Sequence, residues 1–76
     1  MSAFTKAILK DYIELGIAEY VDEDTIKAPE TDTNITLIEE NNVIDIIVNE
    51  QVIQSLDKNS KNFAHIFTET LVSNLN

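Results

Sequence analysis

Apolar residues recur at helical spacing through the N-terminal part of the chain. Over residues 3–20 they form one wide stripe, made up of Phe4, Ile8, Leu9, Tyr12, Ile13, Gly16, Ile17 and Tyr20. This spacing predicts an amphipathic helix, with Ser2 as its N-cap. Gly16 leaves two endings open. Either the helix continues, slightly broken, to about residue 20, or it ends early with Gly16 at C′ and Ile17 packing back. We favour the continuing helix.

The next stretch, residues 21–34, is polar and holds the only proline, Pro29. Proline restricts the residue before it to extended conformations, so no helix should cross this point. A short edge strand over residues 25–28 is one interpretation. We expect a solvated loop instead, because polar residues dominate the stretch.

Two β-branched runs, residues 34–39 and 43–48, give the clearest local signal. Asn41 and Asn42 tolerate the left-handed conformation of a type I′ turn, so we expect an antiparallel hairpin over about 34–48. A turn centred there pairs Glu40 with Val43 and Leu37 with Ile46. The face expected in the core carries Ile35, Leu37, Ile44, Ile46 and Val48. The opposite face carries Thr36, Ile38, Val43, Asp45 and Ile47, and is too apolar for a fully solvated surface.

The C-terminal third predicts two helices. Residues 50–57 read as a short helix with Asn49 as N-cap and with Val52, Ile53 and Leu56 facing inward. Ser60 should cap a final helix over about 61–75, whose apolar stripe is Phe63, Ile66, Phe67, Leu71 and Leu75. The expected fold class is therefore α+β: a small two-layer domain with an N-terminal helix, a central hairpin and two C-terminal helices. A mostly helical bundle with the hairpin as a minor arm is the alternative.

The length of 76 residues allows one domain, residues 1–76, with a thin core. Domains of this size often need disulfides, a metal or a partner subunit, and the chain has no cysteine. We therefore expect oligomerisation or partner binding. Cysteine-free composition and the lack of a signal peptide or a long apolar run favour a cytoplasmic protein without a membrane segment.

Charge is the strongest compositional feature. Fourteen acids stand against five lysines, with no arginine, for a net charge of −9. Residues 11–57 carry 13 of the acids and only Lys27. Such a field repels nucleic acids and anionic membranes and attracts basic surfaces, although it also serves solubility.

The sequence gives little support for a catalytic site or a metal-binding site. His65 is the only histidine and should be an exposed helix residue near Glu69. An EF-hand loop counted from Asp22 fails at its glycine and glutamate positions. The carboxylates of Glu39 and Glu40 lie beside a turn, where we expect contact with water to keep their pKa values in the usual range. With one glycine in the chain, no phosphate-binding loop exists. We expect no enzyme activity, no cofactor and no bound metal.

Two functional hypotheses follow. In the first, the chain is a protein-binding module, oligomeric or an accessory component of an assembly, joined through the apolar hairpin residues Ile38, Val43 and Ile47. In the alternative, it is an acidic inhibitor that blocks the basic site of a nucleic-acid-handling protein, as a nucleic-acid mimic, viral antagonist or immunity protein. That hypothesis rests on the acidic residues Asp11, Glu14, Glu19, Asp22, Glu23 and Asp24. The mimic further needs the first helix to run past Gly16, so that Glu19, Asp22 and Glu23 share one helical face.

Overall fold

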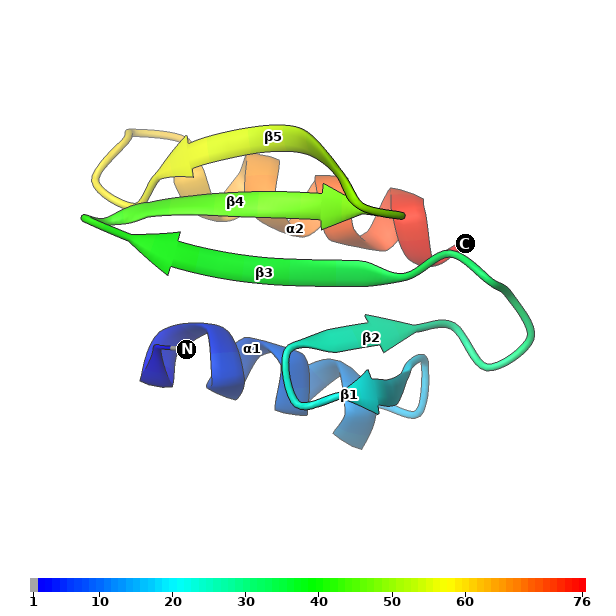
Figure 1. The fold of residues 1–76 in the computed structure, drawn as a ribbon. Coiled ribbons are helices and arrows are strands. Elements are labelled where there is room, and N and C mark those ends of the chain that lie inside the picture. The colour runs from blue at the N-terminus through cyan, green and yellow to red at the C-terminus, as the bar shows by residue number, and fades with distance from the viewer. Residues whose placement is uncertain (1) are drawn as a thin grey trace.

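Two helices and five strands make up the fold of residues 2–76, the part that the computed structural model describes. All five strands form one antiparallel sheet in the order β1-β2-β3-β4-β5, so each strand pairs with its neighbours in sequence. Helices α1 and α2 lie behind the sheet in the view of Figure 1 and run in the same direction. The α+β class and the N-terminal helix are confirmed, whereas the expected second C-terminal helix is wrong.

Helix α1 (Ala3–Glu14) begins as predicted and ends earlier than we favoured. Ser2 is its N-cap, and the Ser2 Oγ accepts a hydrogen bond from the Thr5 amide at 3.1 Å. At the other end Gly16 adopts a φ of +78°. The amides of Gly16 and Ile17 donate to the carbonyls of Ile13 and Tyr12, which is the Schellman pattern. Gly16 is therefore the C′ residue of a short helix, and the chain leaves in a new direction.

The loop expected over residues 21–34 is wrong for its first half, where β1 (Glu19–Asp22) ends and β2 (Thr25–Lys27) forms, whereas residues 28–34 contain no helix or strand. The alternative of a short strand over residues 25–28 is therefore confirmed, although this strand lies between β1 and β3 and not at the edge. The loop expectation was wrong because β1 is fully exposed and shows no apolar alternation. Pairing stabilises it instead, since Tyr20 lies opposite Ile26, which is wholly buried and in turn faces Ile35. Between the strands the Asp22 carboxylate accepts a hydrogen bond from the Asp24 amide at 2.9 Å, which shapes the turn.

The central hairpin is confirmed in both turn and register. Strands β3 (Ile35–Glu40) and β4 (Val43–Val48) pair Leu37 with Ile46 and Glu40 with Val43. The φ angles of Asn41 and Asn42 are +53° and +66°, as a type I′ turn requires. Asparagine reaches these angles at lower cost than other residues with a Cβ atom.

Residues 50–57, expected to be helical, form strand β5 (Gln51–Asp57) at the sheet edge. Asn49 and Glu50 have φ angles of +48° and +72°, so they build a second tight turn rather than a helix start. The Asn49 carboxamide accepts a hydrogen bond from the Asn34 amide at 2.9 Å, which ties this turn to the start of β3. In β5 only Leu56 is buried, while Val52 and Ile53 are exposed. Ile53 is the extra residue at a register shift, because Val52 pairs with Ile47 and Gln54 pairs with Ile46.

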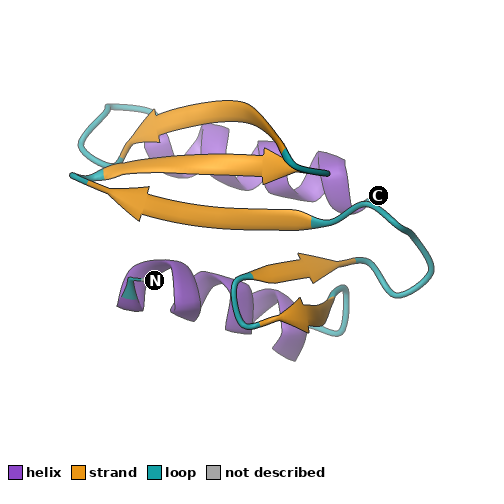
Figure 2. Cartoon of the chain, viewed as in Figure 1, coloured by secondary structure: helices purple, strands orange, loops and turns teal. Residues whose placement is uncertain are grey.

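Helix α2 (Phe63–Leu75) buries the predicted stripe, with Phe67, Leu71 and Leu75 in the core and Phe63 and Ile66 packed against it. Its N-cap is Asn62 rather than Ser60, without a side-chain hydrogen bond. The core lies between the helices and one face of the sheet, as the separation of helices and strands in Figure 2 illustrates. It contains Leu9, Tyr12, Ala18, Ile26, Ile35, Leu37, Ile44, Ile46, Leu56, Phe67, Leu71 and Leu75.

Candidate protein interface

The outer face of the sheet, turned away from the helices, is a surface that no other element of residues 2–76 covers. The strand pairings define the residues of this outer face. They are Glu19, Asp22, Thr25, Lys27, Thr36, Ile38, Glu40, Val43, Asp45, Ile47, Val52, Ser55 and Asp57. The fold thus leaves a single exposed sheet face in a two-layer structure.

Apolar side chains lie across the centre of the outer face. Ile38 is 49% exposed and Val52 is 57% exposed, while Val43 and Ile47 between them are half-buried. Ile47 lies directly opposite Val52 in the pairing of β4 with β5. The three hairpin residues predicted as an apolar interface therefore lie on one surface, and Val52 extends it onto a strand that sequence reasoning had assigned to a helix.

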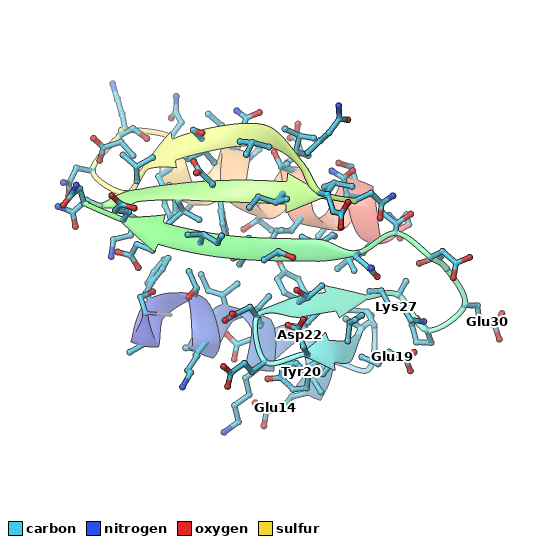
Figure 3. The ribbon with its side chains drawn as sticks, viewed as in Figure 1. Glu14, Glu19, Tyr20, Asp22, Lys27 and Glu30 are labelled. Carbon is cyan, nitrogen blue, oxygen red and sulfur yellow. The ribbon has the colours of Figure 1, made fainter. Side chains whose placement is uncertain are left out.

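The charged residues of the outer face are mostly acidic. Its five acids stand against one lysine, which makes a net charge of −4. Lys27 already forms an ion pair, since its Nζ lies 2.8 Å from the Glu19 carboxylate. Both residues are labelled in Figure 3, near β1 and β2. Asp45 accepts a hydrogen bond from the Ser55 hydroxyl at 2.6 Å, so this carboxylate is held in place. The surface combines an apolar centre with fixed acidic groups.

The six acidic residues predicted from the sequence do not form one surface. Only Glu19 and Asp22 belong to the outer face, whereas Asp11 projects from α1 into the space between the helices. Glu14 is exposed on the last turn of α1, and Asp24 lies in the β1–β2 turn. Asp22 and Glu23 also line a hollow with Lys6 and Lys10, which reduces the local negative charge. Because α1 ends at Glu14, the helical row of Glu19, Asp22 and Glu23 does not exist, so this premise of the mimic hypothesis is wrong.

A groove between α1 and α2, which sequence reasoning did not identify, is the other large apolar surface. It has a volume of about 480 Å³. Its lining residues are Phe4, Ile8, Asp11, Tyr12, Leu15, Ile17, Phe63, Ala64, Phe67, Thr68 and Val72. The exposed Leu15 and Val72 could have signalled it, because each adds an apolar side chain beside a stripe that already faces the core.

Titratable groups with shifted pKa values lie apart from one another. Desolvation raises the pKa of Tyr12, which is buried at the base of the groove. A hydrogen bond from Lys58 lowers the pKa of Glu39, and the Lys58 Nζ lies 2.6 Å from the Glu39 Oε2. The same ammonium group sits 4.6 Å from the centre of the Phe4 ring, so this contact joins three segments of the chain. Its evident role is structural.

The residues to consider as ligands for a metal ion are the acidic side chains and the single histidine. Within residues 2–76 there is no group of three or more His, Cys, Asp or Glu side chains placed to hold a metal ion. The imidazole of His65 is 79% exposed and lies 3.3 Å from the Glu69 carboxylate. Neither helix of the described chain has the length and hydropathy needed to span a membrane.

Comparison with known protein families, with curated proteins and with solved structures finds no match for this chain. The two exposed surfaces are therefore the features of the molecule from which a function can be inferred.

Proposed function

We propose that this chain is a non-enzymatic protein-binding module, an accessory or assembly component that binds its partner through the outer face of the sheet. The observation that carries the proposal is the placement of both helices on the same side, which leaves Ile38, Val43, Ile47 and Val52 without cover. Exposed β-branched side chains gathered on one sheet face are typical of interaction surfaces. Two-layer folds reach a lower free energy when such a face is buried.

The charge of the outer face favours another protein over a second copy of the chain. Two copies packed face to face would bring ten carboxylates together with two lysines that are already paired. Like charges close together at an interface are unfavourable. A partner with apolar side chains at its centre and lysine or arginine around them would complement the surface. Self-association through this face, which the sequence led us to expect, remains the competing form of the proposal and is measured directly below.

The acidic-inhibitor alternative would use the same surface. A partner whose basic site normally holds phosphates would meet the carboxylates of Glu40, Asp45 and Asp57 around an apolar centre. The proposal includes no cofactor, no nucleic-acid ligand and no membrane contact, since the charge repels polyanions and anionic lipid. It keeps the cytoplasmic location expected from the cysteine-free composition.

The test compares two face variants, Ile38→Lys and Ile47→Lys, with the control Ser73→Lys. Ser73 is exposed on α2, so its replacement adds the same charge on the opposite side of the molecule. Each tagged protein is cross-linked in lysate of its source cells, the captured proteins are identified by mass spectrometry, and the affinity of each is then measured with purified components. Circular dichroism checks that the fold is intact.

The proposal predicts a partner that both face variants lose and that Ser73→Lys keeps. Raising the salt concentration should weaken the complex, since part of the attraction is between exposed charges. A partner that binds all three variants equally would contradict the proposal. Sedimentation of the pure wild-type chain decides about self-association: a dimer disrupted by Ile38→Lys would make the partner a second copy.

A further inference from the structure

The groove between α1 and α2 has the dimensions of a helix-binding site. On one wall, Phe4, Ile8, Tyr12 and Leu15 follow one another at helical spacing from the first turn of α1 to its C-cap. Eleven steps along a helix of this kind cover about 16 Å, or three turns. The other wall runs from Phe63 to Val72 along α2, over nearly as many residues. The groove is therefore long and open, in contrast to a closed pocket for a small molecule.

Aromatic rings lie at one end of the groove, and exposed apolar side chains line the other end. The rings of Phe4 and Phe63 lie 6.0 Å apart near the start of both helices. Toward the C-terminal ends, Leu15 is 69% exposed and Ile17 is 43% exposed, and Val72 faces them from α2 at 38% exposure. Because α1 and α2 run in the same direction (Figure 1), the groove follows both helices from their N-terminal toward their C-terminal ends.

The lining of the groove contains one ionisable carboxylate and no cation. Asp11 supplies that carboxylate, in the C-terminal half of α1, among apolar neighbours. The remaining polar side chains of the lining are those of Tyr12 and Thr68. A ligand that fills this groove therefore meets apolar surface along its length and a single negative charge beside the C-terminal half of α1. The chain's net charge of −9 adds to the attraction for a cationic ligand.

We propose that the groove binds an amphipathic helix of another protein, with apolar residues at i, i+3 or i+4, and i+7 and a lysine or arginine that pairs with Asp11. Packed helices have axes about 8–10 Å apart, so the bound helix would lie along the open side of the groove with its apolar face against α1 and α2. A second copy of this chain is a poor ligand because α1 and α2 already bury their apolar stripes against the sheet. This site is independent of the proposed function, since it lies on the opposite side of the sheet from the outer face.

The experiment uses the full chain and a displayed library of random peptides of about 16 residues, a length that spans the groove when helical. The proposal predicts that the enriched peptides share helical apolar spacing and at least one lysine or arginine. One enriched peptide is then synthesised, and its affinity is measured by fluorescence anisotropy for the wild type and for Val72→Glu, Asp11→Lys and Ile38→Glu. Circular dichroism of each variant confirms that it is folded.

Val72→Glu should weaken binding by about tenfold or more, because it places a charge against the apolar side of the peptide. Asp11→Lys should also weaken binding, and a peptide whose basic residue is changed to glutamate should recover affinity for this variant alone. Ile38→Glu is the matched control on the outer face and should leave the affinity unchanged.

Four results would overturn the proposal. Three concern the peptides: no helical pattern among the enriched peptides, an affinity that Val72→Glu does not change, or binding that depends on Ile38 instead. The fourth is binding of dodecanoate in the groove without any peptide binding, which would make the ligand a small apolar molecule. Only binding through Ile38 would involve the outer face, and it would support the proposed function while overturning this one; the other three results leave the proposed function untouched.

Discussion

Replacing Glu50 by glycine should stabilise the protein, although glycine usually weakens regular structure. Glu50 has a φ of +72° in the turn between β4 and β5, a conformation in which the Cβ atom of an L-residue is crowded. The left-handed conformation costs a residue with a Cβ atom about 1–2 kcal/mol. Glycine avoids that cost but loses about 0.5–1 kcal/mol more backbone entropy on folding. The net gain in the free energy of unfolding should be about 0.5–1 kcal/mol.

The sign of the effect distinguishes a turn from a helix at this position. If residues 50–57 were helical, glycine at residue 50 would cost about 1 kcal/mol of helix propensity, and the loss of an acid from the first turn would add to it. The control is Glu50→Ala, which removes the same charge and keeps the Cβ atom. Alanine would be neutral in the turn and favourable in a helix.

Urea and thermal unfolding followed by circular dichroism measure the difference between the glycine and alanine variants. For a domain of this size the expected gain corresponds to a rise in melting temperature of about 2–8 °C. A glycine variant less stable than the alanine variant would refute the turn and, with it, the assignment of β5 as a strand that begins at Gln51.

Three further perturbations test other parts of the fold. Leu71→Ala removes a fully buried side chain from α2 and should lower the free energy of unfolding by about 2–5 kcal/mol in urea; a loss below about 1 kcal/mol would exclude Leu71 from the core. Gly16→Ala should cost about 1 kcal/mol from backbone strain alone, because no atom lies within 4 Å of the added Cβ; an unchanged melting temperature would contradict the C′ assignment. Lys58 lowers the pKa of Glu39, so the stability from ionised Glu39 is present above its unfolded pKa of about 4.3 and is lost as the pH falls through the lower folded pKa. The advantage of the wild type over Glu39→Gln should therefore shrink between pH 7 and pH 3 in urea unfolding, and an equal advantage at both values would rule out this linkage.

The central hairpin could be predicted from sequence because two independent signals agree there. β-branched residues fill both strands, and Asn41-Asn42 suits a turn that needs positive φ at both positions. The strand after it could not be predicted in the same way. Val52 and Leu56 fit helical and extended spacing equally well over so short a segment, and Glu50 is an unusual residue for a tight turn. The turn at residues 49–50 can be recognised only once the pairing of β4 with its neighbouring strands is known.

The candidate surfaces could be predicted only in part, because they depend on where the helices lie against the sheet. The spacing of apolar residues along the chain does not determine that placement. Ile38 and Ile47 were recognised because a hairpin alone defines two faces. Val52 was missed because its strand was missed, and the groove was missed because it needs α1 and α2 side by side. The early end of α1 was one of two stated alternatives, since Gly16 can either continue or end a helix.

The order of the strands also has a consequence for how the chain folds. Each strand pairs with the next one along the chain, so the whole sheet can form by successive closure of short loops. Proteins rich in such local contacts fold quickly, because little chain entropy is lost before each contact forms. The contact that spans most of the sequence is different: it brings Phe4 against Phe63, from the two ends of the chain. We therefore expect the strands to assemble early and the docking of the two terminal helices to limit the rate of folding.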